Sequence, residues 1–97
     1  MNQNIVQAIN AKNLISFMYK DMLRIVGPHA YGETKNGDEK LRAYQVGGQS
    51  ETRTIPCWGL YRVEEIYNLK ILPDLFASPE NDCNKGDKAL FIIYAEL

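Results

Sequence analysis

The sequence predicts a mainly β fold, a small five-stranded antiparallel barrel that begins with an N-terminal α-helix. Residues 14–20 alternate cleanly between two faces, and residues 89–97 form a nearly continuous apolar run, so both segments are expected to be strands. Between them, Asn36-Gly37 is a dipeptide typical of a hairpin turn, because both residues tolerate positive φ. We expect a barrel because closure removes most exposed edges of such apolar strands.

The helix is expected over residues 4–13. Ile5, Ala8 and Ile9 recur there at the spacing of one helical face, and Asn4 is the expected N-cap. In a barrel, such a helix would plug one open end.

Two strands in the centre of the chain organise the predicted fold. Residues 41–48 and 55–66 are rich in aromatic and β-branched side chains. The polar residues 49–54 between them are expected to form the turn of a hairpin.

Two further segments flank this hairpin in the sequence. Residues 23–31 predict a strand after a tight turn at residues 21–22. Pro28 requires a bend or a sheet edge there, because proline cannot donate to a ladder. Residues 67–76 fit either a strand or a short helix, and Pro73 is expected to end either one.

Length and composition limit the classes of protein that need to be considered. Ninety-seven residues, 45% of them hydrophobic, suffice for a single domain over residues 1–97. No apolar run approaches the roughly 20 residues of a membrane helix, and the N-terminus lacks signal-peptide features, so we expect a cytoplasmic protein without a membrane partner. Residues 1–62 carry eight Lys and Arg against five Asp and Glu, whereas residues 63–97 carry three against seven. The mildly basic part suits an anionic ligand but is too weakly charged for strong duplex binding.

Three segments carry a resemblance to a known family. Residues 43–47, Ala-Tyr-Gln-Val-Gly, are similar to a strand that reads roughly Trp-Tyr-Leu-Val-Gly. Residues 59–66, Gly-Leu-Tyr-Arg-Val-Glu-Glu-Ile, are similar to Arg-x-Phe-Arg-Leu-Asp-x-Ile, and residues 24–28 match Arg-x-Val-x-Pro. The sequence therefore resembles the WYL domain, a family of small SH3- or Sm-like β-barrels best known as the sensor half of bacterial transcription regulators.

The resemblance implies a non-enzymatic regulatory domain. Its ligand would be a nucleotide, a short single-stranded oligonucleotide or another small anion, and it would modulate transcription or a partner protein. Family members usually carry a helix-turn-helix domain before the barrel. Because this chain starts at the barrel's helix, we expect a separate DNA-binding partner protein or a longer product. Three signature positions differ, since Ala43, Gln45 and Gly59 stand where the family has Trp, Leu and Arg.

Catalytic and metal chemistry are not expected. The chain has one histidine, His29, and its two cysteines, Cys57 and Cys83, lack the spacing of a metal site. No nucleophile set or phosphate-binding loop is recognisable. We therefore expect no enzyme and no cofactor, and we expect Cys57 and Trp58 to be core residues.

Arg62 is the first candidate ligand-binding residue. Its guanidinium lies in an otherwise apolar strand, where it could clamp a phosphate or a carboxylate with two parallel bonds. Alternatively, it pairs with an acid such as Glu64 or lies on the solvent face. The family's ligand site is thought to use this arginine.

Four more residues complete the candidate site. Tyr44 could stack a nucleic-acid base, or fill the core with its hydroxyl at the rim. Arg42 should share a face with Tyr44 if the strand is regular. His29 could donate to the same ligand or bond a backbone carbonyl, and Ser16 is the weakest candidate.

An Sm-like protein–protein assembly module without a small ligand is the alternative function. The apolar residues 89–95 would then supply a strand edge that pairs between subunits, and we expect a homo-oligomer. A third hypothesis is an accessory subunit of an enzyme.

Overall fold

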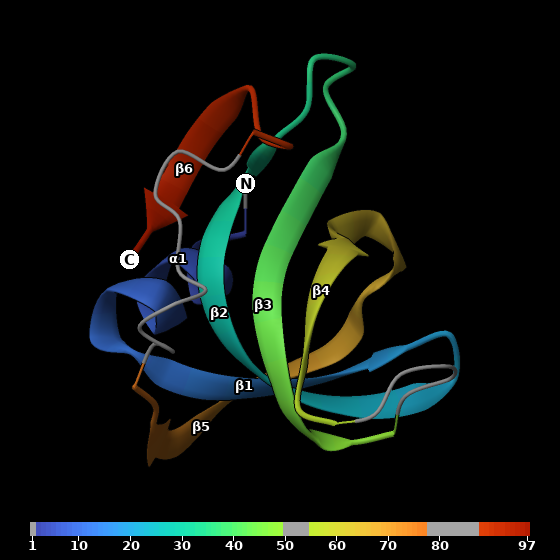
Figure 1. The fold of residues 1–97 in the computed structure, drawn as a ribbon, viewed down its shortest axis with the longest axis vertical. Helices are drawn as coiled ribbons and strands as arrows, with labels where there is room; N and C mark the ends of the chain where they lie inside the picture. The colour runs from blue at the N-terminus through green and yellow to red at the C-terminus, as the bar shows by residue number, and fades with distance from the viewer. Residues whose placement is uncertain (1, 50–54, 78–87) are drawn as a thin grey trace.

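The computed structural model describes residues 2–49, 55–77 and 88–97 (Figure 1). Its elements are α1 (Gln3–Ala11), β1 (Asn13–Tyr19), β2 (Met22–Glu33), β3 (Glu39–Gly48), β4 (Cys57–Arg62), the short 3-10 helix η1 (Val63–Glu65), β5 (Tyr67–Leu75) and β6 (Ile92–Glu96). All recorded strand pairs are antiparallel. The mainly β fold with an N-terminal helix is therefore confirmed.

The described part of the chain has six strands, so the prediction of five was wrong. The segment that fitted either a strand or a helix forms β5, which continues past Pro73 to Leu75. Proline is tolerated there because β5 is an edge strand that pairs with β1. The strand order is β4-β3-β2-β1-β5, with β6 also paired to β2, and this sheet is not closed within the described residues.

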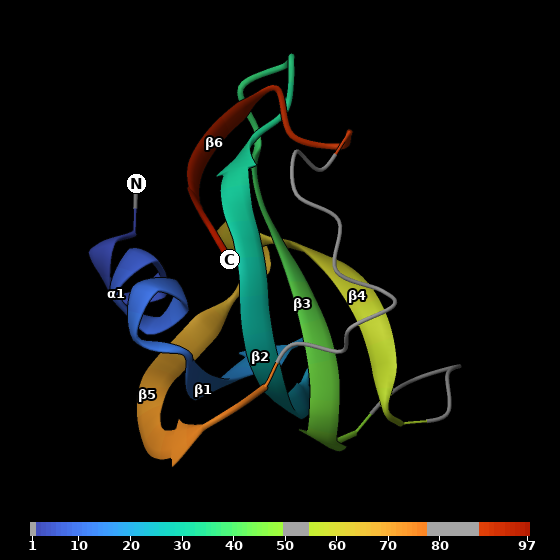
Figure 2. The same cartoon turned by 60° about the vertical axis from the view of Figure 1, so that its left-hand side comes forward.

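The long strand β2 joins the two halves of the sheet. Its first part pairs with β1 and its last part with β6, while β3 runs along its other edge. The ladder with β3 shifts between Pro28 and Ala30, so the bend predicted from Pro28 is present. Figures 1 and 2 show the resulting strongly curved sheet, with α1 beside β1, β5 and β6.

The helix covers the core with one apolar face. Ile5, Ala8 and Ile9 are fully buried, as their spacing predicts. The N-cap is Asn2 rather than Asn4, because the Asn2 side chain accepts the first free backbone N–H groups. The strands contribute the other core residues, which are Ile15, Phe17, Tyr19, Val26, Tyr31, Leu41, Ala43 and Tyr61.

Two of the three predicted turns, those at residues 21–22 and 36–37, lie within the described residues, and both exist with different chemistry from that expected. The first lies at Lys20-Asp21, one residue earlier than predicted, and both residues have positive φ. The second uses positive φ at Gly37 alone, and Thr34 closes it by accepting from the Gly37 N–H at 2.9 Å. One glycine suffices because this loop is longer than a two-residue hairpin turn.

Several expectations about single positions are corrected or lie outside the description. Cys57 is a free, partly buried residue and not part of the core cluster. The predicted final strand is shorter than expected, because β6 begins at Ile92. Cys83 and most of the predicted turn at 49–54 lie outside the described residues. Among the helices that the structure describes, none has the length and apolar character to cross a membrane.

Candidate functional site

Strands β3 and β4 pair so that their outward side chains form cross-strand rows. Lys40 lies opposite Arg62, Arg42 opposite Leu60, and Tyr44 opposite Trp58. Directly opposite residues of an antiparallel pair lie on the same face of the sheet. The alternating positions on β3 are buried and point into the core. We use "outer face" for the surface made by Lys40, Arg42, Tyr44, Trp58, Leu60 and Arg62.

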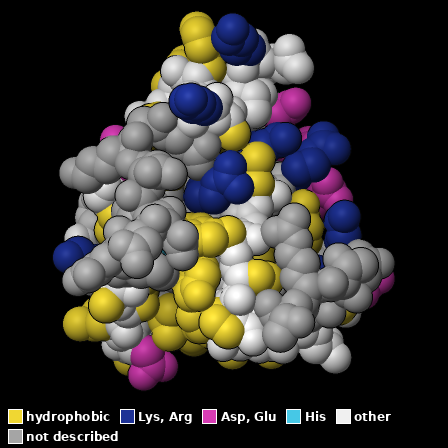
Figure 3. All heavy atoms as spheres, viewed as in Figure 1, with side chains coloured by type: hydrophobic (Ala, Val, Ile, Leu, Met, Phe, Trp, Pro, Cys, Tyr) yellow, Lys and Arg dark blue, Asp and Glu magenta, His cyan; other side chains and the backbone are white. Residues whose placement is uncertain are grey.

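This outer face combines positive charge with aromatic rings. In Figure 3, Lys and Arg side chains gather over the upper parts of β3 and β4, and hydrophobic side chains lie next to them over β2 and β3. Arg42 and Tyr44 are both partly buried on this face, so their predicted placement on one side of the strand is confirmed.

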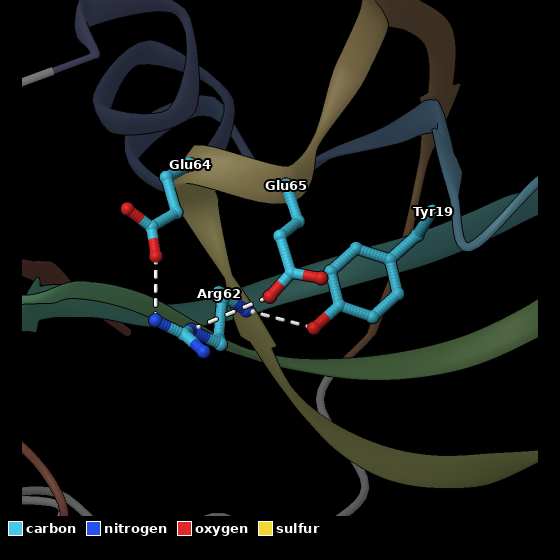
Figure 4. A network of polar contacts seen from close by, with 4 residues as sticks. All are labelled: Tyr19, Arg62, Glu64 and Glu65. Carbon is cyan, nitrogen blue, oxygen red and sulfur yellow. Dashed lines mark hydrogen bonds and ion pairs between the residues drawn. The ribbon is translucent and has the colours of Figure 1, made fainter.

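Arg62 belongs to the outer face and is held by two acidic residues. Its Nη2 lies 2.5 Å from Glu64 Oε1, and its Nε lies 3.4 Å from Glu65 Oε2 (Figure 4). Both acids lie in η1, which directly follows β4. The Arg62 side chain is 49% exposed, and its backbone N–H donates to the hydroxyl of Tyr19 at 3.2 Å. Of the interpretations left open by the sequence, the structure shows the pair with Glu64 on an exposed face.

The backbone of Arg62 is thus fixed, whereas the partners of its guanidinium can be exchanged. The Tyr19 hydroxyl ties the end of β4 to the core. By contrast, an exposed ion pair contributes only about 0–1 kcal/mol. A phosphate group that offers two oxygens can therefore compete with the carboxylates for this guanidinium.

Aromatic rings form the second half of the site. The Tyr44 ring centroid lies 5.0 Å from that of Trp58, with the planes tilted by 59°. The Trp58 ring also contacts His29 at 4.6 Å, edge to face. Trp58 was expected in the core, but its position opposite Tyr44 places it on the outer face. Tyr44 is likewise on this face and not among the core residues.

His29 reaches the outer face because of the irregularity in β2. It lies at the shift in the β2–β3 ladder, and its ring also packs 5.1 Å from Phe76. Phe76 fits over β2 because Gly27 has no side chain: a Cβ there would lie 2.8 Å from the Phe76 ring. The four rings of Tyr44, Trp58, His29 and Phe76 form what we call the aromatic cluster.

The chemistry of His29 follows from its burial. The residue is 4% exposed, and its Nδ1 lies 2.7 Å from the carbonyl oxygen of Gly27. Desolvation lowers the pKa of His29, although the bond to the Gly27 carbonyl raises it. With Nδ1 donating, Nε2 is a buried acceptor that has no hydrogen-bond partner among the described residues. Bonding to a backbone carbonyl was one expected role, but the ring is buried and does not face the solvent.

Ser16 is not brought together with the other predicted site residues. It lies on β1, opposite Ile25 of β2 and Lys70 of β5. One strand, β2, lies between β1 and β3 in the sheet. Two contributors were missed in the sequence: Lys40, which the same alternation as Arg42 and Tyr44 would have revealed, and Phe76, for which the pattern holds no signal.

The described residues contain no group of three or more His, Cys, Asp or Glu arranged to hold a metal ion. Comparisons with family models, with curated proteins and with solved structures find no match to this chain. The site must therefore be interpreted from its own geometry.

Proposed function

We propose that the protein binds a single-stranded oligonucleotide or a nucleotide on the outer face of β3 and β4, without catalysis. One observation carries this proposal: the register of β3 and β4 aligns Lys40 with Arg62 and Tyr44 with Trp58 on one face, with Arg42 between them. Cations hold phosphates and aromatic rings stack bases, which is the combination that single-stranded nucleic acids require.

The distribution of groups favours single strands over duplexes. The three cations lie in adjacent rows, whereas the chain as a whole has a net charge of −1. Duplex binding without sequence preference depends on a larger basic surface. A stacked base adds about 1–3 kcal/mol, and that gain requires a base that is not paired in a helix.

We also propose that the domain is a divergent relative of the WYL family with a small SH3- or Sm-like barrel, and that ligand binding has a regulatory role. The support is that the signature segment 43–47 lies on β3, and that the segment 59–66 begins on the directly paired strand β4 and continues through η1. In this proposal the ligand changes how the outer face meets a partner protein.

Fluorescence anisotropy with a labelled single-stranded RNA of about ten nucleotides tests the binding function. We expect saturable binding that weakens with salt, with a slope of about −2 in log K against log salt for three phosphate contacts. Arg42→Ala and Tyr44→Ala should each weaken binding about tenfold or more. Lys70→Ala is the matched control, because Lys70 is an exposed cation on β5 at the other end of the sheet order.

Two results would overturn the proposal. One is no saturable binding by the unsubstituted protein, and the other is an equal loss in Lys70→Ala and Arg42→Ala. Melting temperatures of all variants exclude loss of folding as the cause.

Assembly through β6 is the second candidate function, and it rests on a separate observation. Phe91, which is 66% exposed, directly precedes β6, and Ile92, which is 44% exposed, is the first residue of this strand, which pairs with β2. In the described part of the chain, β6 has no second partner strand, so its other edge is available for pairing. Association that disappears in Phe91→Glu would support this function.

A further inference from the structure

A buried arginine lies on the opposite side of the sheet from the outer face. Arg24 of β2 is 7% exposed and lies opposite the core residue Phe17 of β1. It bonds to Gln45, which is buried and adjacent in β3 to the outward Tyr44. We call Tyr19, Arg24, Gln45 and Tyr61 the interior cluster.

The hydrogen bonds of Arg24 compensate its charge poorly. Nη1 donates to Gln45 Oε1 at 3.4 Å, and Nη2 donates to the carbonyl oxygen of Tyr19 at 3.5 Å. Both distances exceed the usual range for N–H···O bonds. The Nε atom is buried and has no hydrogen-bond partner among the described residues. The Cζ atom of Arg24 also lies over two aromatic rings, 5.6 Å from the ring centroid of Tyr19 and 6.0 Å from that of Tyr61.

No negative charge from the described residues balances this guanidinium. Its side-chain bonds go to the Gln45 amide oxygen and the Tyr19 carbonyl oxygen, and no carboxylate of the described residues bonds to it. The Tyr61 hydroxyl donates to Gln45 Oε1 at 3.3 Å, and burial raises the pKa of Tyr61, so this phenol stays neutral near pH 7. A buried charge is stable when it is paired and hydrogen-bonded, and within the described residues Arg24 bonds only to neutral acceptors.

The groups around Arg24 are firmly positioned. Gln45 Nε2 donates to the carbonyls of Gly47 at 3.0 Å and Gln49 at 2.8 Å, which orients its Oε1 toward Arg24 and Tyr61. Gly59 permits the Tyr61 ring to lie along β4, because a Cβ on Gly59 would be 2.9 Å from that ring. The guanidinium is therefore held in a built polar environment.

We propose that the interior cluster is a binding site for one small oxyanion, of the phosphate, sulfate or carboxylate class. Arg24 receives it through Nε and the neighbouring Nη, the pair of parallel donors that matches two oxygens of such an anion. The site is independent of the proposed oligonucleotide surface, because Arg24 and the outer-face cations lie on opposite sides of β3. The anion can be free in solution or can be the terminal phosphate of a larger ligand.

Side-chain NMR of the full chain tests the site directly. The chain has four arginines, and the ¹⁵N–¹H signal of each Nε reports its own environment. Inorganic phosphate is titrated at constant ionic strength, with chloride as the balancing anion. We expect the Arg24 signal to shift saturably, and the signals of Arg42 and Arg62 to move less. Assignment comes from Arg42→Lys, Arg53→Lys and Arg62→Lys, which leave Arg24 as the fourth signal, so it does not depend on a variant at Arg24.

Acetate and a mononucleotide with a terminal phosphate distinguish the sources of the anion. Saturation by acetate would assign the site to carboxylates, and tighter saturation by the mononucleotide than by phosphate would assign it to a larger ligand. An Arg24 signal that does not move with any of these anions, or that moves equally with chloride, would overturn the proposal.

Thermal unfolding of the unsubstituted protein and of two arginine variants, each with and without phosphate, gives a second test. Phosphate should raise the melting temperature of the unsubstituted protein and of Arg62→Lys, but not that of Arg24→Met. Arg24→Met removes a desolvated charge, so without phosphate it should melt at or above the unsubstituted protein. The same phosphate-dependent rise in Arg24→Met would refute the site. Oligonucleotide binding by Arg24→Met should be unchanged, which separates failure here from failure of the outer-face proposal.

Discussion

Substitution of Arg62 should separate the effect on ligand affinity from the effect on folding stability most clearly. Its side chain is 49% exposed and contacts two carboxylates at 2.5 and 3.4 Å. The backbone bond to Tyr19 does not depend on the side chain, so Arg62→Ala leaves that anchor in place. We therefore expect a variant that folds normally and binds oligonucleotide poorly.

The magnitudes of the two effects differ enough to be measured. Loss of an exposed ion pair removes about 0–1 kcal/mol, which lowers the melting temperature of a domain this size by less than about 8 °C. Loss of a charged hydrogen bond to a ligand phosphate removes about 1.5–3 kcal/mol of binding free energy. That loss corresponds to an affinity about ten- to a hundredfold lower. Arg62→Lys should restore part of the affinity, because an ammonium cannot make the two-pronged contact.

Glu64 and Glu65 compete with the ligand for Arg62, so removing their charge should act in the opposite direction. Glu64→Gln should raise the affinity by up to about fivefold, which is about 1 kcal/mol. Asp74→Asn, an exposed acid on β5, is the matched control for the change in net charge. Anisotropy titrations and thermal melts of these variants are the assays. An Arg62→Ala protein that binds as well as its parent, or that is unfolded, would refute the reasoning.

Three further predictions concern stability and association. The pKa of His29 in the folded protein lies below its ordinary value of about 6.5, so the stability that depends on neutral His29 should be fully present above that pH and be lost as the pH falls through the lowered pKa. In denaturant unfolding, His29→Gln should lack this pH dependence, which is up to about 1.4 kcal/mol per pH unit. The same pH dependence in His29→Gln as in the unsubstituted protein would contradict the prediction. Gly27→Ala should lower the free energy of unfolding by about 1–3 kcal/mol, because its Cβ would lie 2.8 Å from the Phe76 ring. Phe76→Ala in the same chain should relieve this clash, whereas stability losses that simply add in the double variant would argue against it. Sedimentation should show concentration-dependent association that Phe91→Glu weakens, since Phe91 is exposed beside the β6 edge, whereas a monomer at every concentration would contradict the assembly function.

Local patterns predicted those parts of the fold that depend on neighbouring residues. The period of two in residues 14–20 correctly indicated that Ile15, Phe17 and Tyr19 share a face, and all three are buried. The helix spacing of Ile5, Ala8 and Ile9 was equally informative. The sequence left residues 67–76 open between a strand and a short helix, because β5 is largely exposed at a sheet edge and therefore lacks a clear apolar alternation.

The site could be predicted only in part, because its other parts depend on contacts between distant residues. Alternation alone placed Arg42 and Tyr44 together, but the rows with Arg62 and Trp58 require the register of β3 and β4. Pro28 marks the ladder shift that brings His29 to the aromatic cluster, but the contact with Trp58 depends on a strand distant in the sequence. The burial of Arg24 likewise depends on β1 and β3, which pack beside it in space.

The most direct test of the central claim is a backbone and indole NMR titration of the full chain with single-stranded RNA. The account predicts saturable shifts on β3 and β4, led by Lys40, Arg42, Tyr44 and the Trp58 indole, with little change in α1 and β5. Shifts confined to α1 or β5, or no saturable shift at any residue, would contradict the claim that the outer face binds nucleic acid.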